Sequence, residues 1–240
     1  VAMGDDALGA NTTASSNTAI GTLALRLNTT GHSNNAVGAT ALDANTTGNG
    51  LNAFGYGALG ANTTADGNSA FGHETLLANT TGANNTAIGK EALKANTTGT
   101  FNVAVGSASL DANTTGTYNV AMGSDSLTTN TTGGENTAIG FYALRASTTA
   151  SQNTAVGYNS LGANTTGTFN VCVGSYAGDA ITTGTENTCI GHDTGGGITT
   201  GSNNVVLGRG AANHDTTLTD GAQNVIIGDF NDVSSGSALN

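Results

Sequence analysis

The sequence predicts an all-β fold, a parallel β-solenoid built from coils of 17 residues, and three observations predict it. The block NTAIGKEALKANTTGTF, residues 85–101, is followed at once by NVAVGSASLDANTTGTY, residues 102–118. A glycine recurs at the fifth place of the block in fourteen units, and a three-residue insertion lengthens only the last step. Seventeen residues are too few for the two helices of a helical repeat, but they suit one coil of short strands and turns.

Two strands and two turns are expected in each coil, whose positions are numbered from 1 (Asn85) to 17 (Phe101). Apolar residues at positions 2–4 predict a first strand, which ends at the glycine of position 5 because glycine adopts positive φ without steric cost. Positions 11–14 predict a second strand, usually followed by glycine at position 15. The expected turn glycines are Gly21, Gly38, Gly55, Gly72, Gly89, Gly106, Gly123, Gly140, Gly157, Gly174 and Gly191.

Leucine at position 9 is expected to fill the interior of the coil. It recurs in ten successive units, from Leu8 through Leu161. An apolar position inside a stack needs only a suitable volume, yet the same leucine occurs in each of these coils. We therefore expect position 9 to provide the main core residue. The expected core leucines are Leu25, Leu42, Leu59, Leu76, Leu93, Leu110, Leu127, Leu144 and Leu161.

The constant Asn and Thr residues predict polar ladders, because each side chain of a solenoid lies above its copy in the next coil. Nine Asn-Thr-Thr triplets also fit the acceptor pattern for N-glycosylation. Acceptors about 4.8 Å apart would be too close for a sugar on every coil, so the ladder role is favoured over sparse glycosylation. The asparagines concerned are Asn11, Asn28, Asn45, Asn62, Asn79, Asn96, Asn113, Asn130 and Asn164.

The repeat changes along the chain, which predicts a regular solenoid over residues 1–169 and a tapering section over 170–240. Position 9 becomes Gly178 and then Gly195, while positions 3 and 4 grow to Val206-Leu207. We expect the first strand to replace the lost leucine volume. The tapering section contains the insertion, at 214–223, and ends in a C-terminal cap or a transition to another segment. Cys172 and Cys189 replace alanine at position 3 of adjacent coils, which predicts two buried thiols.

Both faces of the first strand are apolar, and this predicts assembly. Neighbouring side chains of a strand point to opposite sides, so positions 3 and 4 cannot both lie inside one coil. Other copies of the same chain are the simplest cover for the second face. The alternative is that the small alanine at position 3 stays half exposed at little cost.

Composition and motifs argue against several classes of function. The chain has 5 Lys and Arg against 16 Asp and Glu, a net charge of −11, whereas nucleic-acid binding requires basic clusters. The sequence has no apolar run approaching the ~20 residues of a membrane-spanning helix. It offers no nucleophile with its base, no P-loop lysine and no spacing of metal ligands. We therefore expect a non-enzymatic protein without cofactor or metal.

The blocks NTAIG, NTAVG and NVAVG, each followed by Ala-Leu, resemble the head repeats of trimeric autotransporter adhesins, the YadA-like heads. With NTTG between the blocks, the pattern is also similar to repeats in fibre proteins of marine phages and environmental bacteria. The resemblance covers about residues 1–228, although the period of seventeen is longer than the coil usual in those heads. It implies a left-handed β-roll, three chains packed side by side, and display outside the cell or on a virion.

These observations predict a structural rod of an extracellular or virion fibre that acts in adhesion to a surface or cell. Its expected partners are identical chains, as a homotrimer or fibre, and a surface, glycan or protein receptor. One alternative is an ice-binding solenoid, in which Asn at position 12 shares a face with Thr at position 14. Another is an extracellular fibril that stacks end to end through the unpaired strand groups of its open coil ends.

Overall fold

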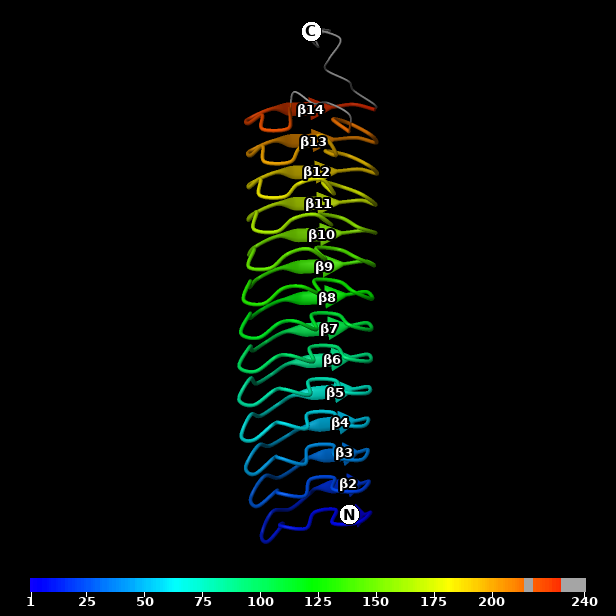
Figure 1. Cartoon of the computed structure of the whole chain (residues 1–240), viewed down its shortest axis with the longest axis vertical. Helices are drawn as coiled ribbons and strands as arrows, with labels where there is room; N and C mark the ends of the chain where they lie inside the picture. Colours follow the sequence, from blue (N-terminus) through cyan, green and yellow to red (C-terminus); the bar gives the residue numbers. More distant parts are fainter. Residues whose placement is uncertain (214–217, 230–240) are drawn as a thin grey trace. The chain divides into compact units, whose positions relative to one another are not determined.

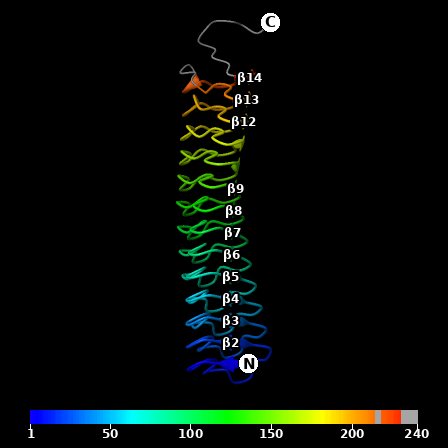
Figure 2. The ribbon, with the colours of Figure 1, turned by 90° about the vertical axis from the view of Figure 1, so that its right-hand side faces the viewer.

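The computed structural model describes residues 1–213 and 218–229. The chain forms a first compact unit, Val1–Asn119, and a second unit that begins at Val120. Each unit is a parallel β-solenoid with one short strand in each coil (Figure 1). The view turned by 90° shows the rest of each coil looping back beside its strand (Figure 2). The predicted all-β solenoid with 17-residue coils is confirmed.

In the first unit, the strands occur at the same place in successive coils and follow one another in chain order. They are β1 (Ala2–Met3), β2 (Thr18–Ile20), β3 (Asn35–Val37), β4 (Asn52–Phe54), β5 (Ser69–Phe71), β6 (Thr86–Ile88) and β7 (Val103–Val105). Each strand pairs in parallel with the next at an offset of one coil, so that Ala87 of β6 lies opposite Ala104 of β7. This register places chemically equivalent residues above one another.

The second unit repeats this arrangement and also accommodates the insertion. Its strands are β8 (Val120–Met122), β9 (Thr137–Ile139), β10 (Thr154–Val156), β11 (Val171–Val173), β12 (Thr188–Ile190), β13 (Val205–Leu207) and β14 (Val225–Ile227). Val206 of β13 pairs with Ile226 of β14, so the sheet register continues across the longer last step. Of the predicted insertion, residues 214–217 lie outside the described residues, as do residues 230–240 of the predicted cap.

The predicted second strand at positions 11–14 is wrong, because this part of the coil is a series of turns and bends. In coil 85–101 the carbonyl oxygen of Leu93 accepts a hydrogen bond from the N–H of Asn96, at 3.1 Å. The N–H groups of Thr97 and Thr98 both donate to the carbonyl oxygen of Thr114 in the next coil, at 3.0 and 3.2 Å. An extended strand points successive N–H groups in opposite directions, so this convergence requires a bent chain.

Left-handed backbone conformations close each coil. The predicted turn glycines at position 5 adopt φ between 131° and 143°. A Cβ atom on Gly89 would also lie 2.5 Å from the carbonyl oxygen of Gly106, so both the φ angle and the close approach require glycine. Positions 7, 9 and 17 are left-handed as well, with φ of 60° at Glu91, 51° at Leu93 and 58° at Phe101. These left-handed residues are not predictable from residue type, since leucine and phenylalanine rarely adopt positive φ.

The core is a column of leucine side chains that is replaced in the last coils. All nine predicted leucines at position 9 have an exposed fraction of 0%. At Gly178, which occupies this position later in the chain, a Cβ atom would lie 2.6 Å from Cys172 Sγ and 3.0 Å from Ile181 Cδ1. Cysteine at position 3 and isoleucine at position 12 thus fill the space of the leucine. The predicted contribution of the first strand to this interior volume is confirmed, whereas the contribution of position 12 is not evident from the sequence pattern.

Candidate functional site

Two asparagine ladders, at positions 1 and 12, run through the interior of most coils and are interrupted at Leu51, Ser147, Ile181 and Ile198. At position 12, Asn45 Nδ2 donates to Asn28 Oδ1 at 2.9 Å and to the Gly48 carbonyl oxygen at 3.1 Å. At position 1, Asn34 Nδ2 donates to the same Gly48 carbonyl, at 2.8 Å. The two ladders therefore converge on position 15 and tie the turns of a coil together. Most polar groups inside the coil are engaged in structure, and Ser147 Oγ and Asn164 Oδ1 are exceptions among the described residues.

The predicted ladder asparagines lie inside this network. Asn11 is half-buried, and an exposed fraction of 0% is found for Asn28, Asn45, Asn62, Asn79, Asn96, Asn113, Asn130 and Asn164. The Nδ2 atom, which would carry a glycan, is the donor in these ladders and points into the coil. This arrangement supports the structural reading of the Asn-Thr-Thr triplets over a glycosylated one.

The outer side of the strands, here called the strand face, carries an exposed apolar row at position 4 beside a mostly polar row at position 2. In the first unit, Ile20, Phe54, Phe71 and Ile88 have exposed fractions of 37–44%. In the second unit, Met122, Ile139 and Ile190 have exposed fractions of 38–43%. Alanine at position 3 is fully buried from β2 through β10. The alternative of a half-exposed alanine is therefore wrong, and position 4 provides the uncovered face.

The threonine pairs form one ladder and one outer row. Thr46 Oγ1, at position 13, donates to the carbonyl oxygen of Thr63 in the next coil at 3.0 Å, and the same bond recurs along both units. Its neighbour Thr47, at position 14, is exposed. The predicted sharing of one face by Asn at position 12 and Thr at position 14 is wrong. The asparagine turns inward because this segment is not an extended strand.

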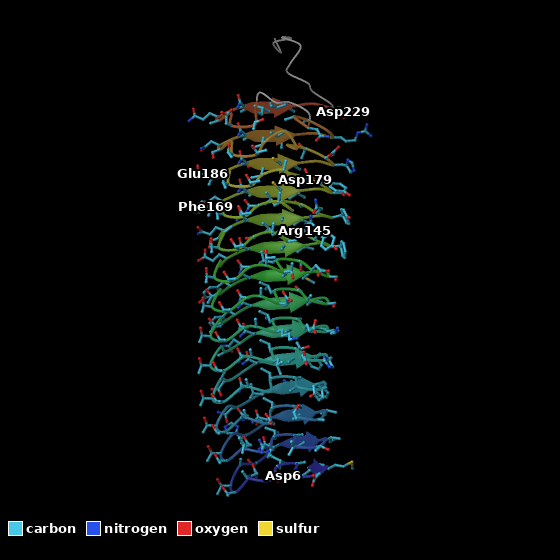
Figure 3. The ribbon with its side chains drawn as sticks, viewed as in Figure 1. Asp6, Arg145, Phe169, Asp179, Glu186 and Asp229 are labelled. Carbon is cyan, nitrogen blue, oxygen red and sulfur yellow. The ribbon has the colours of Figure 1, made fainter. Side chains whose placement is uncertain are left out.

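Aromatic side chains gather at positions 6 and 7 of the second unit, a group here called the aromatic edge. The rings of Phe141 and Tyr158 stack with centroids 5.8 Å apart, and Tyr158 meets Tyr176 edge-on at 5.1 Å. Tyr142 packs on Phe141 at 3.8 Å. The Tyr158 hydroxyl raises the pKa of Tyr176 above its ordinary value. Figure 3 shows Phe169 and Glu186, by contrast, projecting from the left-hand edge of this unit.

The two cysteines lie opposite each other in neighbouring strands and are free thiols. Both are fully buried. Burial and the adjacent Cys189 raise the pKa of Cys172 well above the usual thiol value, so the thiol stays protonated at neutral pH. These are properties of a core residue, since reactive cysteines have lowered pKa values and some exposure.

The described residues contain no group of three or more His, Cys, Asp or Glu side chains arranged to hold a metal ion. No helix among these residues is long and apolar enough to cross a membrane. Burial raises the pKa of Asp179, and nearby Asp193 raises it further. The carboxylate of Asp193 is itself hydrogen-bonded, because Asn213 Nδ2 donates to Asp193 Oδ2 at 2.7 Å.

No family model matches the chain, and neither a curated protein nor a solved structure is significantly similar to it. The geometry of the coil therefore provides the functional argument. Sequence reasoning missed the aromatic edge, because its residues alternate between positions 6 and 7 and no single column stands out. The sequence did contain a signal for this group, because aromatic residues recur at 141, 142, 158 and 176, one or two residues after the glycine of position 5.

Proposed function

We propose that this chain is a non-enzymatic structural protein that forms the rod of an extracellular or virion fibre and acts in adhesion to a surface or cell. In this proposal identical chains assemble side by side through the strand face. The observation that carries the proposal is the half-exposed apolar row at position 4, which recurs coil after coil in both units.

The free energy available from burying the strand face comes from its repetition along the chain rather than from any one residue. Burying the exposed part of one isoleucine or phenylalanine gains on the order of 1 kcal/mol. A single such residue on a surface is ordinary, but a continuous apolar row is typical of an interaction surface. Because the row repeats with the coil, an identical row on another chain matches it in spacing. Three chains is the number that the resemblance to trimeric adhesin heads implies.

The arrangement of polar groups supports a mechanical role. Asparagine amides bond within and between coils, and threonine hydroxyls bond to the next coil. Each coil is thereby fixed to its neighbours through both backbone and side chains, which favours a stiff and regular structure. Length, stiffness and a repeated outer surface are the properties that a fibre requires.

The proposal is tested by placing one polar residue on the strand face of each unit. We expect Ile88→Asn combined with Ile139→Asn to convert associated chains into single chains, measured by sedimentation velocity. The matched control is Thr98→Asn with Thr149→Asn, which changes exposed residues of position 14 in the same coils. An unchanged mass for the Ile88/Ile139 variant, with unchanged circular dichroism, would contradict the assembly through this face.

A further inference from the structure

Arg145 differs from the other basic side chains that the structure describes. Arg26, Lys90, Lys94 and Arg209 each lie within 4 Å of a carboxylate oxygen, at distances of 3.6, 3.8, 2.7 and 3.6 Å. Within the described ranges, Arg145 has no such ion pair. Its guanidinium Cζ lies instead 4.9 Å from the centre of the Tyr142 ring. This exposed cation is thus held in place by an aromatic ring.

The comparison with Lys94, at the same coil position, explains the difference. Lys94 Nζ lies 2.7 Å from Glu74 and 3.4 Å from Glu91, which occupy position 7 of the preceding and the same coil. This contact lowers the pKa of Glu74 and raises that of Lys94. Around Arg145, position 7 of the same coil is Tyr142 instead of a carboxylate. In the same coil an acid is exchanged for an aromatic ring, and in the preceding coil the shorter Asp125 stands in place of Glu74 and forms no ion pair with Arg145 within the described ranges.

Tyr142 connects this cation to the other side chains of the aromatic edge. Tyr142 packs on Phe141, whose ring stacks on Tyr158 of the next coil. Phe141 and Tyr158 have exposed fractions of 40% and 44%. The side chain of Asn159 lies over Gly162, where a Cβ atom would collide with its amide. Gly162 occupies the position of Arg145 one coil further on, so the Asn159 amide, rather than a longer side chain, lies at this position.

We propose that Phe141, Tyr142, Arg145, Tyr158 and Asn159 form a binding site for a carboxylated pyranose within a polysaccharide, a uronate. The guanidinium pairs with the sugar carboxylate, as Arg does when it donates two parallel hydrogen bonds. The exposed rings pack against the apolar C–H face of the pyranose, and the Asn159 amide bonds to its hydroxyl groups. The aromatic centroids, 5.8 and 5.1 Å apart along successive coils, repeat at about the length of one sugar unit.

The negative charges around this site set its expected salt dependence. Asp125 occupies position 7 of the preceding coil and accepts a hydrogen bond from Ser124 Oγ at 2.9 Å. Asp179 lies at the position of Arg145 two coils further on, and Figure 3 labels Asp179 and Arg145 in the second unit. These carboxylates repel a uronate at long range, whereas the Arg145 contact attracts it at short range. Moderate salt should therefore weaken binding only slightly, because it screens both effects.

The inference rests on the proposed adhesive role and gives it a ligand class, but its test does not depend on the number of chains. The probe is an oligogalacturonate, with its methyl ester as the matched uncharged ligand, in calorimetric titrations of the full chain. We expect the acid to bind at least tenfold more tightly than the ester. Arg145→Gln should remove this difference, and Tyr158→Ala should weaken both ligands, while Tyr158→Phe retains the binding.

Arg26→Gln is the control, because Arg26 has the same coil position but is paired with Asp43 at 3.6 Å. Light scattering on every variant separates a loss of assembly from a loss of the site. Equal binding of acid and ester, no heat with either, or an equal loss in Arg26→Gln would overturn the proposal. Inorganic polyphosphate that binds as tightly as the uronate, and equally well to Tyr158→Ala, would also overturn it, because it would indicate a simple anion site.

Discussion

Coils 85–101 and 170–186 share their length and their strand register but fill their interiors differently. The first places Leu93 at position 9 and Asn96 at position 12, and both are fully buried. The second places Gly178 and Ile181 at these positions and Cys172 at position 3. The total volume of the interior side chains is therefore kept similar in the two coils, although different positions supply it.

The two solutions carry different costs. Leu93 has a φ of 51°, a conformation that costs a leucine about 1–2 kcal/mol. Gly178 adopts a φ of 59° without that cost. In return, the leucine coil keeps Asn96 in the ladder, where its Nδ2 donates to Asn79 Oδ1 at 2.8 Å. An isoleucine at position 12 cannot continue the asparagine ladder. The two coils that have one, here called the isoleucine coils, contain Ile181 and Ile198 and follow one another directly.

The largest effect is expected from Leu93→Ala. The alanine would leave a cavity in the leucine column and lower the free energy of unfolding by about 3 kcal/mol. Leu27→Ala, at an exposed fraction of 42%, is the control and should change it little. Urea unfolding followed by circular dichroism measures both. Similar losses for the two variants would mean that position 9 is not the main core residue.

Gly178→Leu tests whether positions 3, 9 and 12 share one interior volume, because it adds a side chain to a coil that is already filled. The new side chain would collide with Cys172 and Ile181, so we expect a loss of about 2 kcal/mol. Adding Cys172→Ala and Ile181→Asn would recreate the composition of a leucine coil and should recover at least half of that loss. If the triple variant unfolds as easily as Gly178→Leu alone, the three positions do not share one volume.

Alkaline pH should destabilise the isoleucine coils through Cys172. Because its pKa is raised in the folded chain, the folded thiol holds its proton at a pH where the unfolded thiol has lost it. Its contribution to stability is therefore complete below the ordinary thiol pKa of 9.0 and is lost as pH rises above it. The slope approaches about 1.4 kcal/mol per pH unit.

Unfolding free energies at pH 8 and pH 10, in the presence of a reductant, measure this effect. Cys172→Ala should show a shallower decline than the unchanged chain. Parallel declines for the two proteins would exclude a contribution from this thiol.

A smaller gain is expected from Ser147→Asn. Ser147 interrupts the ladder of position 12, and its buried Oγ has no hydrogen-bond partner among the described residues. An asparagine would continue the ladder and raise the free energy of unfolding by about 1 kcal/mol. Ser147→Ala, which only removes the hydroxyl, should leave stability within about 0.5 kcal/mol. Hydrogen exchange of coil 136–152 measures both, and a Ser147→Asn variant less protected than Ser147→Ala would contradict the ladder.

The solenoid was predictable from the sequence because the period fixes which residues lie above one another. The pairing of Ala87 with Ala104 and the burial of Leu93 follow once the coil length is known. The asparagines of position 12 were equally accessible to this reasoning, since a ladder requires the same side chain in each coil.

The path of the chain between the strands was not predictable in the same way. A strand is predicted at positions 11–14, but Thr97 and Thr98 donate to one carbonyl and bend the chain. Neither propensity nor periodicity indicates a left-handed leucine, because tertiary packing imposes it. The aromatic edge, and the lack of an ion pair at Arg145 within the described ranges, depend on which side chains meet across coils, which a single-coil pattern does not reveal.

Assembly through the strand face can be decided by the molar mass of the unchanged chain in solution, measured by light scattering after size exclusion. If the strand face joins identical chains as proposed, the mass is three times 23.4 kDa. A mass of 23.4 kDa over the whole range of concentrations would contradict it and leave the apolar row of position 4 exposed to solvent.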